Sequence, residues 1–352
     1  MNLFTTGRTV AVAGLALAAA MSAAVPASAQ QITGAGSTFG TPVYSKWGEA
    51  AKAAIGVELN YQSIGSGAGQ NQITNRTVDF GASDAPMDPA KIESAKLLQF
   101  PSVMGAVVPI VNIPGIAANQ MKLTGELLAD IYLGKITKWN DPRLVEANNG
   151  LKLPSIAIAP VYRADGSGTT YVYTSYLSDV SPAWKSGVGS ATSVKWVVGN
   201  GAKGNEGVAA TVRQVRGGIG YVEFAYAEQN KLATTQLRNK AGQFVTPSMA
   251  SFQAAASHAD FAAVKNFAID LNDGQGADTW PIMTATFILL PVNPTDPSKS
   301  LGVMKFFQWC LTNGGDIATK LDYVPLPKPV ADMVMASWKA SIKAPDGSAV
   351  YK

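Results

Sequence analysis

Short apolar runs rich in β-branched residues alternate along this chain with longer segments in which apolar residues recur every three or four positions. The short runs predict strands at residues 57–62, 78–82, 103–112, 156–162, 194–198, 219–223 and 284–290. The longer segments predict helices at residues 42–54, 89–97, 125–133, 169–177, 207–215, 261–271, 301–311 and 329–341. This alternation favours an α/β fold with parallel or mixed sheets.

Four loops at the predicted strand-to-helix junctions are rich in glycine and small polar residues. They cover residues 34–39, 65–69, 83–86 and 163–169. In open α/β sheets, ligands bind beyond the carboxyl ends of the strands, where helix N-termini present unpaired N–H groups. Glycine lets the backbone approach an anion closely because it has no Cβ. Together the four loops predict a site for a small oxyanion.

The loop at residues 163–169, with the sequence Arg-Ala-Asp-Gly-Ser-Gly-Thr, carries the most specific chemistry. Asp165 can pair with the Arg163 guanidinium, which would orient its N–H groups and offset part of its charge. Thr169 can donate a hydrogen bond at the N-terminus of the following helix. Taken by itself, the segment is equally compatible with an ordinary turn that carries a surface arginine.

Asp84 is unexpected in an anion site, because a carboxylate repels an anionic ligand. It favours a ligand with a proton to donate, since phosphate near neutral pH retains at least one proton whereas sulfate retains none. An unmatched buried acceptor costs about 1–3 kcal/mol, and more when it is charged, so discrimination against sulfate is expected. The alternative interpretation is that Asp84 caps a local turn before Pro86.

Motifs for other chemistries are weak or absent. Residues 199–204 match G-x-G-x-x-G, but we interpret them as a loop because the remainder of a dinucleotide-binding unit is not found, and no P-loop sequence occurs. His258 and Cys310 are the only histidine and cysteine, which excludes a His/Cys metal centre and an intrachain disulfide. Cys310 is expected in a buried helix and His258 in a helix connection. Neither Ser66 nor Ser167 fits the nucleophile elbow G-x-S-x-G.

The first 29 residues predict a cleavable export signal. Arg8 precedes an apolar, alanine-rich segment, and Ala27-Ser28-Ala29 fits the small-residue cleavage signature. The alternative is an uncleaved membrane anchor. No cysteine follows the signature, so we expect a periplasmic protein without a lipid anchor.

Residues 30–352 are enough for two domains and a large core. Cleavage of the signal would lower the formal net charge from +4 to +3, because the segment carries one basic and no acidic residue. That charge is too weak to indicate a nucleic-acid or membrane partner.

Several long segments together resemble the periplasmic phosphate-binding protein of the phosphate-specific ABC transporter. In chain order they are residues 33–39, 60–62, 65–67, 78–86, 130–136, 163–169 and 218–223. The resemblance covers nearly the whole chain after the signal. It implies a class II solute-binding fold with two lobes, a phosphate ion in the cleft between them, no cofactor and no enzymatic activity.

The resemblance also implies a role for individual residues. The implied phosphate ligands are Thr38, Phe39, Ser66 and Asp84 in one lobe, and Arg163, Ser167, Gly168 and Thr169 in the other. Phe39 and Gly168 would donate through their backbone N–H groups. Asp84 would accept the phosphate proton, while Asp165 would hold Arg163 from behind.

The lobes are expected at residues 30–104 with 283–352, and at residues 105–282, with crossovers near Met104 and Met283 as the hinge. The resemblance implies a monomer that delivers phosphate to the permease subunits of an importer with a cytoplasmic ATPase. Three other functions stay open at this point: a receptor for another oxyanion such as sulfate or molybdate, an exported phosphatase or other hydrolase, and a surface interaction protein.

Overall fold

The computed structural model describes residues 30–352, and the predicted export signal at residues 1–29 lies outside the described residues. The main sheet has nine strands in the order β2-β1-β3-β12-β4-β8-β6-β7, with β9 paired to β4. These strands are β1 (Gln30–Gly36), β2 (Val57–Ser63), β3 (Phe80–Ser83), β4 (Leu97–Asn112), β6 (Ala159–Arg163), β7 (Asn200–Ala202), β8 (Gly218–Glu223), β9 (Ala233–Thr234) and β12 (Met283–Pro291). A small second sheet contains β5 (Lys122–Leu123), β10 (Gln236–Arg238) and β11 (Phe244–Val245).

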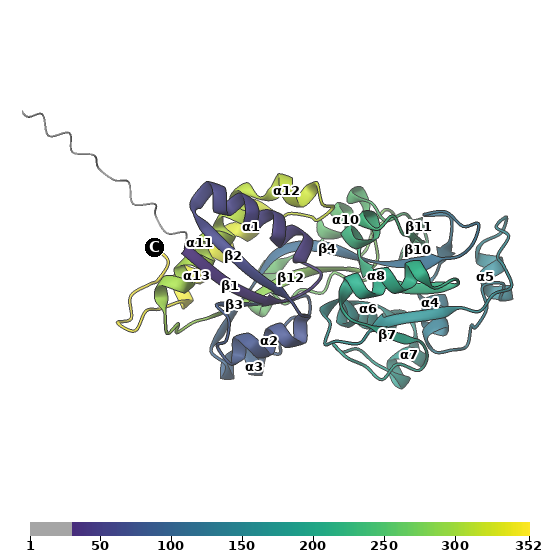
Figure 1. The fold of residues 1–352 in the computed structure, drawn as a ribbon, viewed down its shortest axis with the longest axis horizontal. Helices are drawn as coiled ribbons and strands as arrows, with labels where there is room; N and C mark the ends of the chain where they lie inside the picture. Colours follow the sequence, from purple (N-terminus) through teal and green to yellow (C-terminus); the bar gives the residue numbers. More distant parts are fainter. Residues whose placement is uncertain (1–29) are drawn as a thin grey trace, which may run out of the picture.

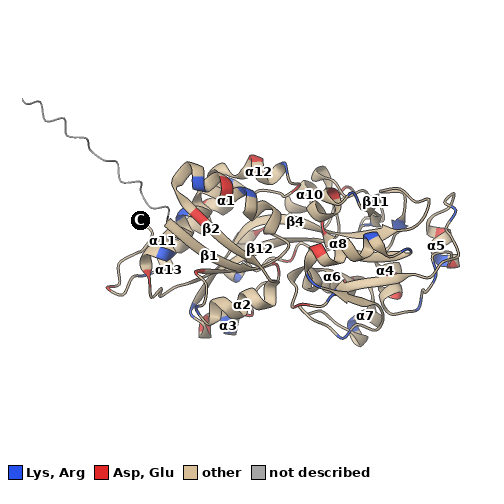
Figure 2. Cartoon of the chain, in the orientation of Figure 1, with Lys and Arg blue, Asp and Glu red and all other residues tan. Residues whose placement is uncertain are grey.

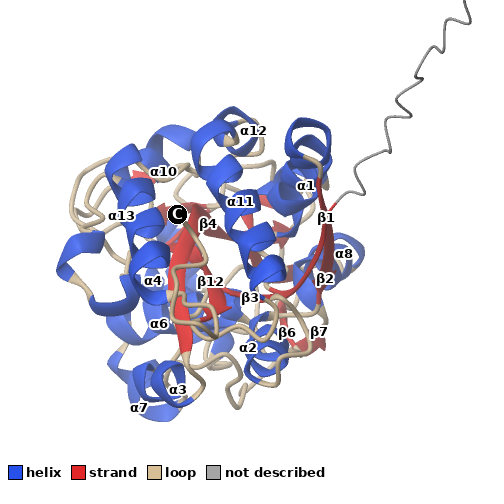
Figure 3. Ribbon diagram, turned by 90° about the vertical axis from the view of Figure 1, so that its left-hand side faces the viewer, coloured by secondary structure: helices blue, strands red, loops and turns tan. Residues whose placement is uncertain are grey.

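Helices surround the strands on the outside of the molecule (Figure 3). The α-helices are α1 (Thr41–Ile55), α2 (Ser66–Thr74), α3 (Pro89–Ser94), α4 (Gly125–Tyr132), α5 (Pro142–Ala147), α6 (Gly168–Val180), α7 (Pro182–Gly187), α8 (Gly204–Gln214), α9 (Phe224–Gln229), α10 (Met249–Ala256), α11 (Pro297–Asn313), α12 (Gly315–Thr319) and α13 (Lys328–Ser341). Within the described residues no helix is long and apolar enough to cross a membrane.

Strand β4 belongs to both halves of the main sheet. Its first part pairs antiparallel with β12, from Leu97 opposite Pro291 to Ala106 opposite Met283, and its second part pairs antiparallel with β8. Figure 1 shows β1–β3 with α1 and α2 in one half of the molecule, and α4, α6 and α8 in the other. We call these the first and second lobes. The expected fold class, α/β with two lobes, is confirmed.

Parallel pairing brings the glycine-rich loops of each lobe to one edge of the sheet. In the first lobe, β1 lies between β2 and β3 and is parallel to both. In the second lobe, β6 is parallel to β7 and β8. Gly36, at the end of β1, has a φ of 138°, and a Cβ at this position would lie 2.0 Å from the Ala82 carbonyl oxygen. Only glycine therefore permits the observed approach of β1 to β3.

The main apolar cluster extends through both lobes, and a second, smaller cluster packs Ile73 of α2 and Ile92 of α3 with Leu289 of β12. In the first lobe, the Phe307 ring of α11 contacts Tyr44, Phe80 and Phe100 edge to face, with ring centroids 6.1, 5.2 and 5.8 Å away. Cys310 is buried in the same helix, as predicted. Figure 2 shows lysine and arginine positions mixed with aspartate and glutamate positions in both halves of the molecule, so neither charge is confined to one half.

Two predicted elements are wrong. Residues 194–198 form no strand, because Trp196 stacks on Tyr162 with centroids 5.0 Å apart and β7 takes the place beside β6. Residues 261–271 form two short 3₁₀ turns instead of a helix, since Asn266 and Phe267 have φ values of 55° and 54°. Such angles interrupt a right-handed helix.

The interpretation of residues 199–204 as a loop is also wrong, because residues 200–202 form β7 and Gly204 begins α8. Helix α8 therefore starts three residues earlier than predicted. His258 lies in the turn after α10, in agreement with the predicted helix connection.

Substitution of Phe307 by alanine is expected to lower the free energy of unfolding by about 3–5 kcal/mol, because the change leaves a cavity among packed aromatic rings. Urea unfolding of the purified protein would measure this loss. The matched control is Val197→Ala at a residue that is 54% exposed, for which a change within about 0.5 kcal/mol is expected. Similar losses for both variants would contradict the packing argument.

Candidate functional site

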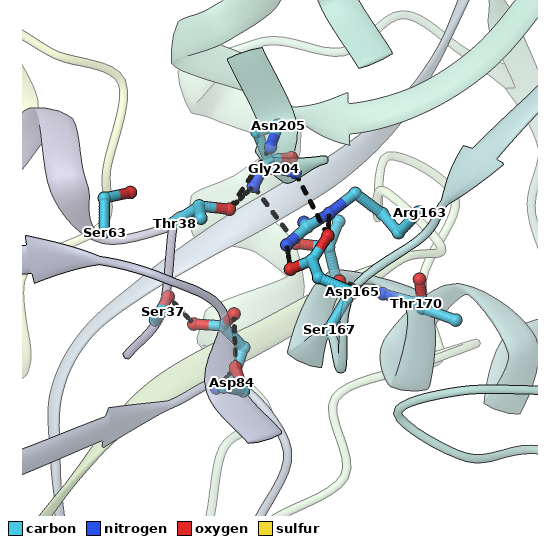
Figure 4. Close-up of polar contacts among 12 residues, drawn as sticks. Ser37, Thr38, Ser63, Asp84, Arg163, Asp165, Ser167, Thr170, Gly204 and Asn205 are labelled. Atoms are coloured by element: carbon cyan, nitrogen blue, oxygen red, sulfur yellow. Dashed lines mark hydrogen bonds and ion pairs between the residues drawn. The ribbon is translucent and has the colours of Figure 1, made fainter. Parts of the chain in front are cut away.

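The structure brings all nine predicted site residues together where the two lobes meet. Figure 4 shows five of them: Thr38, Asp84, Arg163, Asp165 and Ser167. The Gly67 N–H donates across the lobes to the Gly166 carbonyl at 2.9 Å. The side chains of the site are almost fully withdrawn from solvent, with exposed fractions of 2% for Thr38, 0% for Phe39, 1% for Ser66, 1% for Asp84, 3% for Arg163, 0% for Ser167 and 0% for Thr169. The arrangement is a closed, dry site formed by loops from both lobes.

The two oxygens of the Asp84 carboxylate differ in how many hydrogen bonds they already accept. Its Oδ1 accepts hydrogen bonds from the hydroxyls of Ser37 at 2.6 Å and Thr286 at 2.8 Å. Its Oδ2 has a single contact, with Ser66 Oγ at 3.3 Å. Oδ2 therefore remains able to accept a proton donated by a ligand, as the sequence interpretation of Asp84 requires.

Burial raises the pKa of Asp84 to about 6, from an ordinary value of 3.8. The hydrogen bonds from Ser37 and Thr286 and the positive charge of Arg163 oppose this rise, and they keep the pKa from going higher. The carboxylate is therefore predominantly ionised at neutral pH, where it can act as a hydrogen-bond acceptor.

Arg163 is buried and held by Asp165. Its Nε donates to Asp165 Oδ1 at 2.8 Å and its Nη2 to Asp165 Oδ2 at 2.5 Å, while its Nη1 donates to Thr169 Oγ1 at 3.3 Å. Two of the five guanidinium N–H groups, one on Nη1 and one on Nη2, remain for a ligand. Although burial alone would raise the pKa of Asp165, the bonds from Arg163 and the Gly204 N–H lower it, so the pair is ionic.

Several backbone N–H groups at the site have no hydrogen-bond partner within residues 30–352. They belong to Thr38, Phe39, Ser66, Gly168 and Thr169. Gly168 and Thr169 open the 13-residue helix α6, whose N-terminus favours a negative charge. Ser167 caps this helix by accepting the Thr170 N–H at 3.0 Å, so its own hydroxyl hydrogen is free to donate.

Three tyrosines fix the loop between β1 and α1. The carbonyl groups of residues 37–39 accept hydrogen bonds from Tyr61 at 2.7 Å, Tyr226 at 2.6 Å and Tyr323 at 2.6 Å. Since the three carbonyls are engaged in this way, the loop is held in one conformation with its unpaired N–H groups at the site.

Sequence reasoning missed several residues that touch the predicted site. They are Ser37 and Thr286 beside Asp84, Asn205 beside Thr38, and the tyrosines of the β1–α1 loop. Ser37 lies within a predicted loop, where the run of small polar residues was a usable signal. Thr286 and Asn205 approach the site from remote parts of the chain, and nothing in their local sequence indicates this.

The charged side chains of the site do not add up to a positive pocket. Arg163 carries one positive charge, while Asp84 and Asp165 carry negative charges. Attraction of an anion must therefore come from N–H and O–H dipoles together with the paired guanidinium.

The sequence matches known proteins over most of its length. A sequence model of the PBP superfamily domain matches residues 22–313. The phosphate-binding protein PstS of Pasteurella multocida is 50% identical over 329 residues, which cover 94% of this chain and 96% of the relative. The phosphate-binding protein PstS of Haemophilus influenzae is 50% identical over 317 residues, which cover 90% of this chain and 95% of the relative.

Solved structures with the same fold are also phosphate-binding proteins by name. A phosphate-binding protein from Stenotrophomonas maltophilia superposes with a TM-score of 0.69 at 20% identity. The match covers 91% of this chain and 98% of the Stenotrophomonas protein. A high-affinity periplasmic phosphate-binding protein, PfluDING, bound with phosphate gives a TM-score of 0.69 at 20% identity. The match covers 88% of this chain and 94% of PfluDING. At this identity the likeness concerns the fold.

The raised pKa of Asp84 predicts how the stability of the protein without phosphate depends on pH. Because the folded state holds the Asp84 proton more tightly than the unfolded state, this group stabilises the fold below about pH 4, and the contribution is lost as pH rises to about 6. This difference in pKa between the folded and unfolded states corresponds to about 3 kcal/mol. Asp84→Asn should remove that part of the pH dependence.

Urea unfolding of both proteins at intervals between pH 4 and pH 7 would test this. The expected result is that the variant becomes the more stable of the two towards neutral pH. Stability curves that run parallel over the whole range would contradict the assigned pKa.

Proposed function

Since the chain belongs to the PstS family of phosphate-binding proteins within the PBP superfamily, we propose that it binds inorganic phosphate and delivers it to a phosphate-specific ABC importer. One observation carries the choice of ligand: beyond its bond from Ser66, the buried Asp84 keeps one acceptor position on Oδ2, opposite a set of donors. An anion that has a proton to donate and several oxygens that accept matches this pattern. Phosphate near neutral pH is such an anion, and sulfate is not.

We assign the phosphate ligands residue by residue. From the first lobe they are the Thr38 hydroxyl, the Phe39 N–H, Ser66 and the Asp84 carboxylate, and from the second lobe the Arg163 guanidinium, the Ser167 hydroxyl, the Gly168 N–H and Thr169. The two unpaired N–H groups of Arg163 suit two phosphate oxygens. Asp165 does not touch phosphate in this proposal but holds Arg163 in place through its two bonds.

Binding is proposed to close the lobes about the strands that join them. The proposed lobes are residues 30–104 with 283–352, and residues 105–282, so the hinge falls within β4 and at the start of β12. Closure removes water from the ligand and sets the donors of both lobes around it at the same time. In a dry site these dipoles bind an anion more strongly than they would in water.

The arrangement of the site favours a binding protein over a hydrolase. Ser167 Oγ accepts a backbone N–H, and Ser66 Oγ accepts the Asp84 N–H at 3.2 Å. His258 is the only histidine of the chain, and its Nε2 lies beside Gly276. No histidine therefore stands next to either serine to remove its proton, as a Ser-His-Asp mechanism requires.

We further propose that the protein is exported by its first 29 residues, is not lipid-anchored, and acts as a periplasmic monomer that docks on the permease subunits of the importer. The named relatives support a place in phosphate transport. The small net charge and the mixture of charges on the surface support the proposal of no nucleic-acid partner.

Isothermal calorimetry at neutral pH with phosphate and with sulfate tests the function. The wild-type protein should bind phosphate and discriminate strongly against sulfate. Asp84→Asn should narrow the ratio of the two affinities by about 10-fold or more, because the uncharged amide presents N–H donors that sulfate can accept from.

The matched control is Asp332→Asn, which makes the same change of charge at a side chain that is 51% exposed. The control should leave both affinities unchanged. Equal affinity of the wild-type protein for the two anions would refute the assignment of Asp84. Turnover of a chromogenic phosphoester that disappears in Ser167→Ala would favour a hydrolase instead.

Gly168→Ala tests the closure of the lobes. In the closed structure, an added Cβ would lie 2.5 Å from Ser66 Oγ and 2.6 Å from Asp84 Cβ, both in the other lobe. The variant should therefore weaken phosphate binding by about 10-fold or more while the protein without phosphate keeps its unfolding free energy within about 1 kcal/mol.

Calorimetry and urea unfolding would measure the two quantities. Gly187→Ala, with no atom within 4 Å of the added Cβ, is the control and should bind phosphate normally. Unchanged affinity of Gly168→Ala would show that bound phosphate does not require this approach of the lobes.

A further inference from the structure

Asn205 lies buried between the two lobes and bonds to both. It is the second residue of α8 and is 0% exposed. Its Nδ2 donates to Thr38 Oγ1 of the first lobe at 2.7 Å (Figure 4). It also donates to Thr169 Oγ1 of the second lobe at 3.2 Å. Its backbone N–H also donates to Thr38 Oγ1, at 3.3 Å. One side chain thus links two residues that are proposed to bind phosphate, Thr38 in the first lobe and Thr169 in the second.

The orientation of the Asn205 amide is fixed from the opposite side. Its Oδ1 accepts the backbone N–H of Glu223, at the end of β8, at 3.0 Å. Because an N–H group can only donate, the amide oxygen must face Glu223 and the amide nitrogen must face the two threonines. Rotation of the amide by half a turn would leave the Glu223 N–H without an acceptor in a buried place.

The bonds to the threonines decide what their hydroxyls can do. A hydroxyl has one hydrogen and two lone pairs. Thr38 Oγ1 accepts twice from Asn205, and Thr169 Oγ1 accepts once from Asn205 and once from Arg163 Nη1. Both lone pairs of each oxygen are then occupied. Each threonine can offer a ligand its hydrogen and nothing else.

We propose that Asn205 is a positioning residue that makes Thr38 and Thr169 obligate donors and thereby fixes how phosphate is oriented in the closed site. This inference rests on the proposed function. A protonated phosphate oxygen cannot donate to either threonine, so the oxygens bound there are unprotonated. The protonated oxygen then faces the remaining acceptor position on Oδ2 of Asp84.

Asn205→Ala is expected to weaken phosphate binding by about 10- to 100-fold, because both hydroxyls regain the freedom to turn away from the ligand. The decisive measurement is the same substitution in a Thr38→Val/Thr169→Val background, made by calorimetry. If Asn205 acts through the hydroxyls, Asn205→Ala in that background should weaken phosphate affinity by less than about 3-fold. An equal loss in both backgrounds would overturn the proposal, since a general packing defect is independent of the hydroxyls.

Asn205→Asp provides a second variant that keeps the bond from Glu223 and the size of the side chain. Its carboxylate accepts where the amide donated, so the threonine hydroxyls should turn towards it and away from phosphate. The loss of affinity should exceed that of Asn205→Ala. The same variant in the double-valine background measures the charge repulsion alone. If Asn205→Asp lowers phosphate affinity there as much as in the wild-type background, the proposal is overturned.

Asn239→Ala is the matched control, because Asn239 is 5% exposed and donates to the carbonyls of Gly276, Ala277 and Thr279 away from the site. It should lower the melting temperature without changing phosphate affinity. A wild-type protein that fails to bind phosphate would refute the proposed function, and this inference with it. A wild-type protein that binds normally, with Asn205→Ala unaffected, would refute this inference alone.

Discussion

The pairing of β4 with both β12 and β8 is the constraint on which the rest of the molecule depends. Because β4 pairs with β12 in one lobe and β8 in the other, it joins the sheets of both lobes and sets how their loops face each other. The strands that join the lobes also touch the site directly. Thr286 of β12 bonds to Asp84 Oδ1, and a Cβ on Gly105 of β4 would lie 2.7 Å from the Phe39 ring. In the proposed closure, movement at these strands would therefore act directly on Asp84 and Phe39 of the first lobe.

A balance of charges follows from this closed geometry. An isolated guanidinium in a dry cleft would be costly before the ligand arrives, and Asp165 offsets that cost with two bonds to Arg163. The pair still leaves two N–H groups for an anion. Asp84 then adds a negative charge that a fully deprotonated anion cannot tolerate. In the proposed site, affinity and selectivity would thus come from the same set of groups, and the net charge of the chain would contribute little.

The sequence was sufficient for the parts of the site that depend on local chemistry. Arg163 with Asp165, and the glycines and hydroxyls at strand ends, carry their signal within a few residues, and parallel pairing explains why they converge. Asn205 and Thr286 carry no such signal, because their roles depend on the register of α8 and β12 against distant loops. The same limit explains the strand wrongly predicted at residues 194–198. There the apolar side chain of Trp196 packs on other aromatic rings instead of a neighbouring strand.

A site lined with hydroxyls is ambiguous by itself, since each hydroxyl can donate or accept. Selectivity for one protonation pattern requires that this ambiguity be removed before the ligand binds. At Thr38 and Thr169 the structure removes it with N–H donors of Asn205 and Arg163, which occupy both lone pairs of each oxygen. At Ser167 the Thr170 N–H occupies one lone pair, and the hydroxyl hydrogen can donate. The Gly40 N–H does the same at Ser37, whose hydroxyl then donates to Asp84. The residues that face away from phosphate therefore determine which of its oxygens can carry the proton.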